Sequence, residues 1–211
     1  MGKVDDNKRK KKDAIVNSAF DLFIENGIND TSISDIVKRA GLAKGTFYLY
    51  FKDKYEVRDY LVMKKAARIF EKAQQSMQEA DVHTLEEKML FLIDDILNQL
   101  NANKLLLRFI SKNLSWGIFQ NVVHNMPADE HNQSVEQYIQ QLFAESDKEF
   151  RNPEMMLFMI VELINSTAHN VILYQQPVSL EELKKELYPI IRQTIHHFEV
   201  NFDKEGETVL N

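Results

Sequence analysis

Apolar residues recur every three or four positions along most of the sequence, and this spacing constrains the fold more than any other feature. It places the apolar side chains on one face of an α-helix. No segment shows the alternation of β-branched residues that is typical of strands. The chain also has only six glycines and four prolines to interrupt helices. The sequence therefore predicts an all-α fold.

Turn and capping residues divide the first 54 residues into three short helices. An apolar stripe predicts a helix over residues 13–26, which Gly27 would end in a left-handed conformation. A hydroxyl group of Thr31, Ser32 or Ser34 would cap a two-turn helix that carries Ile36, Val37 and Ala40. After Gly41 and Leu42, helical character resumes over residues 43–51. We expect these helices to share one small apolar cluster.

The remaining residues predict a larger helical body. A long helix is expected from Lys54 to about Ala80, and two capping boxes mark further helix starts. The boxes are Thr84 to Glu87 and Ser179 to Glu182. The other expected helices cover residues 104–123, 132–146 and 153–174, and the all-round apolarity of the last predicts burial against several neighbours. The expected domains are residues 1–54 and 55–211.

Charge is distributed unevenly along the chain. The net charge is −6, but residues 1–60 carry 12 Lys and Arg against 10 Asp and Glu. Residues 8–12 are all basic, which is typical of a DNA-binding arm and equally of a disordered, solvated tail. The sequence has no cysteine and no unbroken run of eighteen apolar residues. We therefore expect a cytoplasmic protein with no metal site, no cofactor and no membrane association.

The segment from residue 31 to residue 54 predicts a helix, a glycine-containing turn and a second helix, the helix-turn-helix design. In that design the second helix enters the major groove of DNA. Its expected start supplies a cation at Lys44, a close-approach position at Gly45, and hydroxyl groups at Thr46, Tyr48 and Tyr50. These groups suit contact with phosphates and base edges.

Residues 9–55 resemble the TetR family of bacterial regulators. The resemblance is carried by Ala-Phe-Asp-Leu-Phe-Ile-Glu-Asn-Gly in the first helix and by Ala-Gly-Leu-Ala-Lys-Gly-Thr-Phe-Tyr-Leu-Tyr-Phe-Lys-Asp-Lys later. It implies phosphate contacts by residues such as Tyr48, Tyr50 and Lys54, and base contacts near Thr46. Leu49 departs from the usual polar or aromatic residue and could touch a thymine methyl group. The DNA-binding residues predicted in this way are Ser32, Lys44, Gly45, Thr46, Tyr48, Leu49, Tyr50 and Lys54.

Several neighbours of these residues are assigned to other roles. Ile36, Val37, Phe47 and Phe51 fall on the shared apolar face, so we expect them in the core. Ala43 replaces a frequent serine, which removes one possible phosphate contact. Lys52 and Arg58 are expected to be solvated charges.

For the body, the resemblance implies a homodimer formed by the last two helices and a cavity for a small apolar or aromatic effector. Glu162 and His169 are candidate ligand contacts, because they are polar residues in an otherwise apolar helix. They are seven residues apart and therefore lie on one face of it. The same residues could instead lie at the dimer interface, and the apolar candidates could be ordinary core. The predicted ligand-binding residues are Met89, Ile93, Phe109, Trp116, Phe119, Phe158, Met159, Glu162 and His169.

These features favour a repressor that binds a palindromic operator as a dimer and is released by an effector. One alternative is a helix-turn-helix regulator or activator that answers to a protein partner and has no small-molecule cavity. An enzyme is disfavoured, because the sequence shows no nucleophile and base pair, phosphate loop or metal-ligand spacing.

Overall fold

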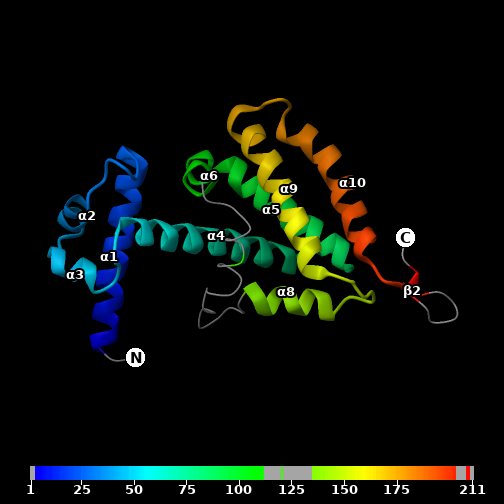
Figure 1. Cartoon of the computed structure of the whole chain (residues 1–211), viewed down its shortest axis with the longest axis horizontal. Helices are drawn as coiled ribbons and strands as arrows, with labels where there is room; N and C mark the ends of the chain where they lie inside the picture. The colour runs from blue at the N-terminus through cyan, green and yellow to red at the C-terminus, as the bar shows by residue number, and fades with distance from the viewer. Residues whose placement is uncertain (1–2, 112–119, 121–134, 203–207, 210–211) are drawn as a thin grey trace. The chain divides into compact units, whose positions relative to one another are not determined.

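The computed structural model describes residues 3–111, 120, 135–202 and 208–209 (Figure 1). Contacts divide the chain into two compact units, Met1–Lys65 and Ala66–Asn211. The predicted all-α fold is confirmed, with one exception among the described residues. Near the C-terminus, β1 (Asn201–Phe202) pairs in antiparallel fashion with β2 (Thr208–Val209).

The first unit contains three helices and the start of a fourth. Its elements are α1 (Lys3–Asn26), α2 (Ile33–Ala40), α3 (Lys44–Tyr48) and the first part of α4 (Lys54–Gln78). The start predicted for the first helix is wrong by ten residues, because helical structure includes the polar N-terminal segment. Aspartates lie in its first turn, where they interact favourably with the helix dipole, and Asp6 pairs with Arg9 and Lys10 at helical spacing.

The predicted apolar cluster is confirmed as the core of the first unit. Its fully buried side chains come from every helix and include Ile15, Ile36, Phe47 and Val57. Buried Thr31 donates a hydrogen bond to the carbonyl oxygen of Gly27, the residue that follows α1, at 2.8 Å. The core and this polar contact together hold α1 and α2 against each other.

The second unit contains the rest of α4 and the remaining elements. The further helices are α5 (Leu85–Ala102), α6 (Lys104–Ser111), α8 (Val135–Ala144), α9 (Pro153–Tyr174) and α10 (Leu180–Phe198). Both predicted capping boxes are present, at Thr84 with Glu87 and at Ser179 with Glu182. α9 begins and ends where the sequence predicts. The expected helix over residues 104–123 is described only to Ser111, and its remainder lies outside the described residues, apart from helical Gln120.

A polar cluster joins α5 to α10. The ammonium group of Lys184 lies 2.8 Å from an Asp94 carboxylate oxygen and donates to the Asn98 side-chain oxygen at 2.6 Å. The Tyr188 hydroxyl also donates to Asp94. Burial alone would raise the pKa of Asp94, but the hydrogen bonds from Lys184 and Tyr188 outweigh it and lower that pKa. We call these four side chains the Lys184 cluster.

The expected burial of α9 against more than one neighbour is confirmed, but part of its apolar surface stays exposed in the single chain. α9 packs against α5, α6 and α10, yet Met155, Phe158 and Met159 remain 46%, 38% and 48% exposed. On α10, Ile190 is also 47% exposed. Among the described helices, α9 alone is long and apolar enough to cross a bilayer. Length and composition of this kind are shared by core helices of water-soluble proteins, and α9 contacts three other helices.

Candidate nucleic-acid interface and apolar cavity

Capping interactions at both ends of α2 fix the connection between α2 and α3. Before α2, the Ser32 hydroxyl accepts a hydrogen bond from the Asp35 amide at 3.2 Å, and the Asp35 carboxylate accepts one from the Ser32 amide at 3.0 Å. After α2, Gly41 has a φ of +67°, which L side chains rarely adopt. The Leu42 amide then donates back to the Val37 carbonyl oxygen at 2.9 Å. Local hydrogen bonds therefore set a helix-turn-helix, as the sequence predicts.

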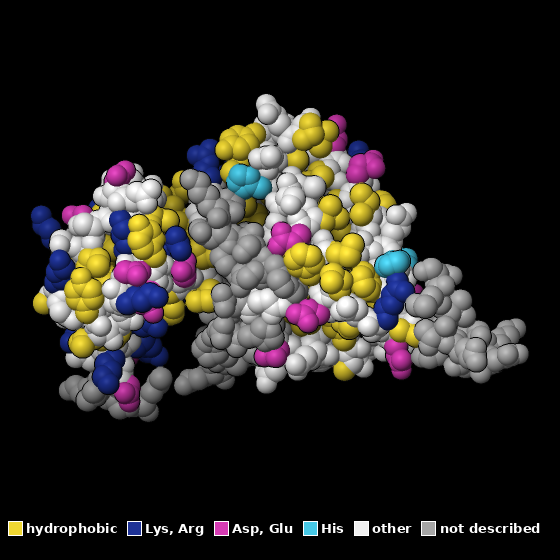
Figure 2. Space-filling model, in the orientation of Figure 1, with side chains coloured by type: hydrophobic (Ala, Val, Ile, Leu, Met, Phe, Trp, Pro, Cys, Tyr) yellow, Lys and Arg dark blue, Asp and Glu magenta, His cyan; other side chains and the backbone are white. Residues whose placement is uncertain are grey.

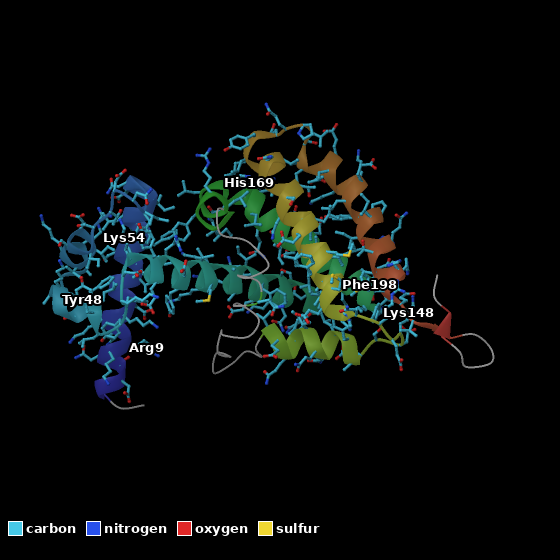
Figure 3. The ribbon with its side chains drawn as sticks, viewed as in Figure 1. Arg9, Tyr48, Lys54, Lys148, His169 and Phe198 are labelled. Atoms are coloured by element: carbon cyan, nitrogen blue, oxygen red, sulfur yellow. The ribbon has the colours of Figure 1, made fainter. Side chains whose placement is uncertain are left out.

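α3 and the residue after it have one buried side and one exposed side. Phe47 is fully buried and Phe51 is 4% exposed, as expected for core residues. Tyr48 and Leu49 are 52% and 80% exposed, and Lys44 is also exposed. Figure 3 shows Tyr48 on this short helix. The exposed side thus presents a cation, a phenol and an aliphatic group, which can contact phosphates and base edges.

Gly45 lies in α3, and the fold does not require a glycine there. A methyl group added at its Cα would meet no heavy atom within 4 Å. Glycine is less favourable than alanine inside a helix by up to about 1 kcal/mol. A glycine without an internal packing reason is expected where another molecule must approach the backbone closely. Thr46, the residue after Gly45, and Tyr50, which follows the end of α3, are half-buried.

Ser32 and Lys54, two predicted phosphate contacts, already have partners within the first unit. Ser32 forms the cap of α2, and its hydroxyl donates to the Asp35 carboxylate at 2.6 Å. This hydrogen bond is the main reason that the pKa of Asp35 lies below its usual value. The Lys54 ammonium donates to the carbonyl oxygens of Asn29 and Thr31 at 2.8 and 2.9 Å. An ammonium has three donors, so Lys54 can still offer one to a phosphate.

The basic residues 8–12 form part of α1 and are neither an extended arm nor an unstructured tail. Arg9 and Lys10 pair with Asp6, while the Lys12 ammonium lies 4.0 Å from the centre of the Tyr60 ring. Figure 3 shows Arg9 on this helix.

The second unit contains an apolar cavity of about 220 Å³. Side chains from α4, α5, α6, α8 and α9 line it. Of these residues, all are apolar except Asn165. The lining residues are Ala66, Ile69, Phe70, Leu85, Met89, Leu92, Ile93, Ile96, Leu100, Ile110, Val135, Ile139, Leu142, Phe143, Leu157, Ile160, Val161, Ile164 and Asn165.

The cavity includes some of the predicted ligand-binding residues and not others. Met89 and Ile93 line it, whereas Phe109 is buried elsewhere in the unit. Trp116 and Phe119 lie outside the described residues.

Four predicted residues on α9 do not line the cavity: Phe158, Met159, Glu162 and His169. They follow one stripe of the helix, whereas the lining residues at 157, 160, 161, 164 and 165 follow another. Sequence spacing identifies both stripes but does not say which one faces inward.

Asn165 is the polar residue of the cavity that sequence reasoning missed. Its side-chain nitrogen is buried and has no hydrogen-bond partner. A buried donor without an acceptor is rare in folded proteins and destabilising. The sequence feature that could have identified Asn165 is its position as a single amide on an apolar stripe of α9, four residues after Val161 and eight after Leu157.

Apolar side chains also gather on the surface over α9 and α10 (Figure 2). We define the α9–α10 surface by Met155, Phe158 and Met159 on α9 and by Ile190 on α10. Each of these side chains is at least 38% exposed. Contiguous apolar surface of this kind often marks a site of protein association.

Sequence comparison relates the first unit to a known family. Residues 15–61 match the family described as "Bacterial regulatory proteins, tetR family". A fatty acid metabolism regulator protein from Bacillus subtilis (strain 168) is 35% identical over 86 residues, which cover 41% of this chain and 43% of the relative. The chain thus matches less than half the length of that relative. The proteins similar in sequence are named as regulators, in agreement with the expectation that the chain is not an enzyme.

Solved structures extend the likeness to the whole fold. A TetR-family transcriptional regulator from Streptomyces coelicolor has a TM-score of 0.64 at 15% identity, covering 90% of this chain and 97% of the other. The fatty acid degradation regulator FadR from Bacillus halodurans has a TM-score of 0.53 at 22% identity, covering 85% and 96%. At these identities the likeness concerns the fold, an N-terminal helix-turn-helix domain followed by a helical domain.

Proposed function

Because residues 15–61 belong to the tetR family of bacterial regulatory proteins, we propose that this chain is a cytoplasmic transcriptional repressor that binds operator DNA as a homodimer and is released by a small apolar effector. The exposed side of α3 carries this proposal. It combines exposed Lys44, Tyr48 and Leu49 with a glycine that the fold does not need.

In the proposed complex, α3 lies in the major groove. Thr46 and Leu49 read base edges, and Gly45 lets the backbone approach the DNA. Lys44, Tyr48 and Tyr50 contact phosphates, together with the remaining donor of Lys54. Ser32 and the N-terminal end of α2 contribute a further phosphate contact, in which the exposed hydroxyl must share its hydrogen bonds with Asp35.

Dimerisation through α9 and α10 accounts for the apolar α9–α10 surface, which a monomer would leave in water. A twofold dimer presents two copies of α3, and half-sites about 34–36 Å apart would match one turn of DNA.

Phe158→Glu places a charge on the α9–α10 surface, and we expect it to weaken the dimer at least about 100-fold, because the charge would have to be desolvated. Sedimentation measures the change, and Lys185→Glu on exposed α10 surface is the control. Unchanged association of Phe158→Glu would exclude this interface.

The effector would act through α4, since this one helix contributes to both functional regions. Lys54, at the start of α4, donates hydrogen bonds to carbonyl oxygens of the segment before α2. Further along the same helix, Ala66, Ile69 and Phe70 line the cavity. A ligand changes the DNA affinity only if it binds one arrangement of the dimer more tightly than another. The apolar cavity favours a small-molecule effector over control by a protein partner. Two of the similar proteins, one from Bacillus subtilis and one from Bacillus halodurans, are named as regulators of fatty acid metabolism or degradation, and these two names support an aliphatic effector.

Selection of bound duplexes from a random DNA pool, followed by gel-shift titration, tests the repressor's DNA contact. We expect a palindromic site, and we expect Lys44→Ala and Tyr48→Ala each to weaken its binding about tenfold or more. Lys44→Ala should also reduce the dependence of affinity on salt, because one phosphate contact is lost. Lys72→Ala on exposed α4 surface in the second unit is the matched control. Unchanged affinity in both α3 variants would refute the proposed contact.

A further inference from the structure

We propose that the cavity binds a neutral aliphatic carbonyl compound, such as an ester, whose carbonyl oxygen accepts a hydrogen bond from the Asn165 side chain. As a statement about the effector, this inference rests on the function proposed above. As a statement about binding, it rests on the cavity alone.

Among the described lining residues there is no Lys, Arg or His, and no Asp or Glu. An ionised carboxylate in this cavity would lose its hydration without gaining a cation. A free fatty acid anion is therefore a poor ligand for this cavity, whereas an ester or amide of the same chain loses far less on leaving water.

Asn165 contributes a buried side-chain nitrogen that has no acceptor, on the α9 stripe that includes Leu157, Val161 and Ile164. A ligand carbonyl oxygen would supply the missing acceptor, and in a low-dielectric surrounding this hydrogen bond is stronger than in water. The single donor fixes the polar end of the ligand, and the apolar walls receive its chain.

The cavity of about 220 Å³ exceeds the roughly 150 Å³ apolar cavity that suffices for benzene. It therefore has room for a ligand larger than one six-membered ring, such as an aliphatic chain of medium length. Methyl octanoate is a suitable probe, with octanoate as its charged counterpart and n-hexane as a probe that lacks an acceptor.

The test measures binding of these three probes to the full-length protein by calorimetry at neutral pH, without DNA. We expect the wild type to bind methyl octanoate at least tenfold more tightly than octanoate. In Asn165→Leu, methyl octanoate should bind about tenfold more weakly, while n-hexane binds as before or more tightly. Asn170→Leu, the same substitution at an exposed position of α9, should leave all three affinities unchanged.

Three results would overturn the inference. One is octanoate binding as tightly as the ester in the wild type, a comparison that needs no variant. Another is full retention of ester affinity in Asn165→Leu, and the third is an equal loss of ester and n-hexane, which would mean that leucine merely fills the cavity. Gel shifts then separate the two proposals. An ester that binds but does not change operator affinity leaves this inference standing and refutes the effector role, whereas loss of DNA binding in the α3 variants bears only on the repressor function.

Discussion

The two units use polar side chains in different ways. In the first unit, the polar groups that shape the helix-turn-helix have partners within the unit, as Thr31, Ser32 and Lys54 illustrate. In the second unit, the Lys184 cluster is similarly paired, but the cavity leaves the Asn165 nitrogen without an acceptor. A site on the surface needs a rigid, fully bonded support. A site in the interior needs space and a free polar group, and both lower stability until a ligand binds.

The largest expected effect tests whether the paired polar groups of the second unit hold it together. Lys184→Ala removes the ammonium from Asp94 and Asn98 and should reduce the free energy of unfolding by about 2 kcal/mol. This is less than for a fully buried pair, because the Asp94 side chain is 41% exposed. Urea unfolding at fixed protein concentration measures the change. Exposed Lys185→Ala should stay within about 0.5 kcal/mol of the wild type, and an equal loss in both variants would mean that the Lys184 cluster has no special role.

A smaller effect distinguishes the two glycines of the helix-turn-helix. Gly41→Ala should destabilise the protein by about 1 kcal/mol, because residue 41 has a positive φ. Gly45→Ala should stabilise it by about 0.5 kcal/mol, because the helix gains a better residue and the methyl group meets nothing. Thermal unfolding measures both changes, and gel shifts should show weaker operator binding for Gly45→Ala. A stabilised variant that bound DNA normally would remove the close-approach role of Gly45.

The smallest expected effect concerns pH and again the Lys184 cluster. The pKa of Asp94 lies below its usual value of 3.8 in the folded chain, so its ionisation adds stability above about pH 4 and this contribution disappears as pH falls through the lowered pKa. Asp94→Asn should therefore be less stable than the wild type at pH 7. The difference should shrink in urea unfolding measured at progressively lower pH below about 4. A difference that is independent of pH would show that the charge of Asp94 contributes nothing.

Sequence reasoning was most successful where a few neighbouring residues decide the structure. The hydroxyls of Ser32, Thr84 and Ser179 each cap a helix as expected, because a capping box involves residues only three positions apart. It was wrong at the start of α1. The polar segment before residue 13 has no apolar stripe, and its helical structure is supported by charge pairs rather than by burial.

The two candidate sites also differ in how well the sequence predicted them. Local spacing placed Phe47 inward and Tyr48 outward on a helix that is anchored by its neighbours. On α9, however, one apolar stripe lines the cavity and another is exposed to solvent, and the residues at 158, 159, 162 and 169 belong outside the cavity. Helical spacing is the same for both stripes, so the sequence could not select between them.

The sequence by itself determined the all-α fold, most helix boundaries and the side of α3 that faces solvent, since these depend on spacing and capping within a few residues. Only the tertiary structure decided which stripe of α9 borders the cavity, that α4 and α8 help to line it, and that Asn165 lies there without an acceptor. The physical reason is that a cavity is a property of several helices packed together, and its position depends on contacts between residues far apart in the chain.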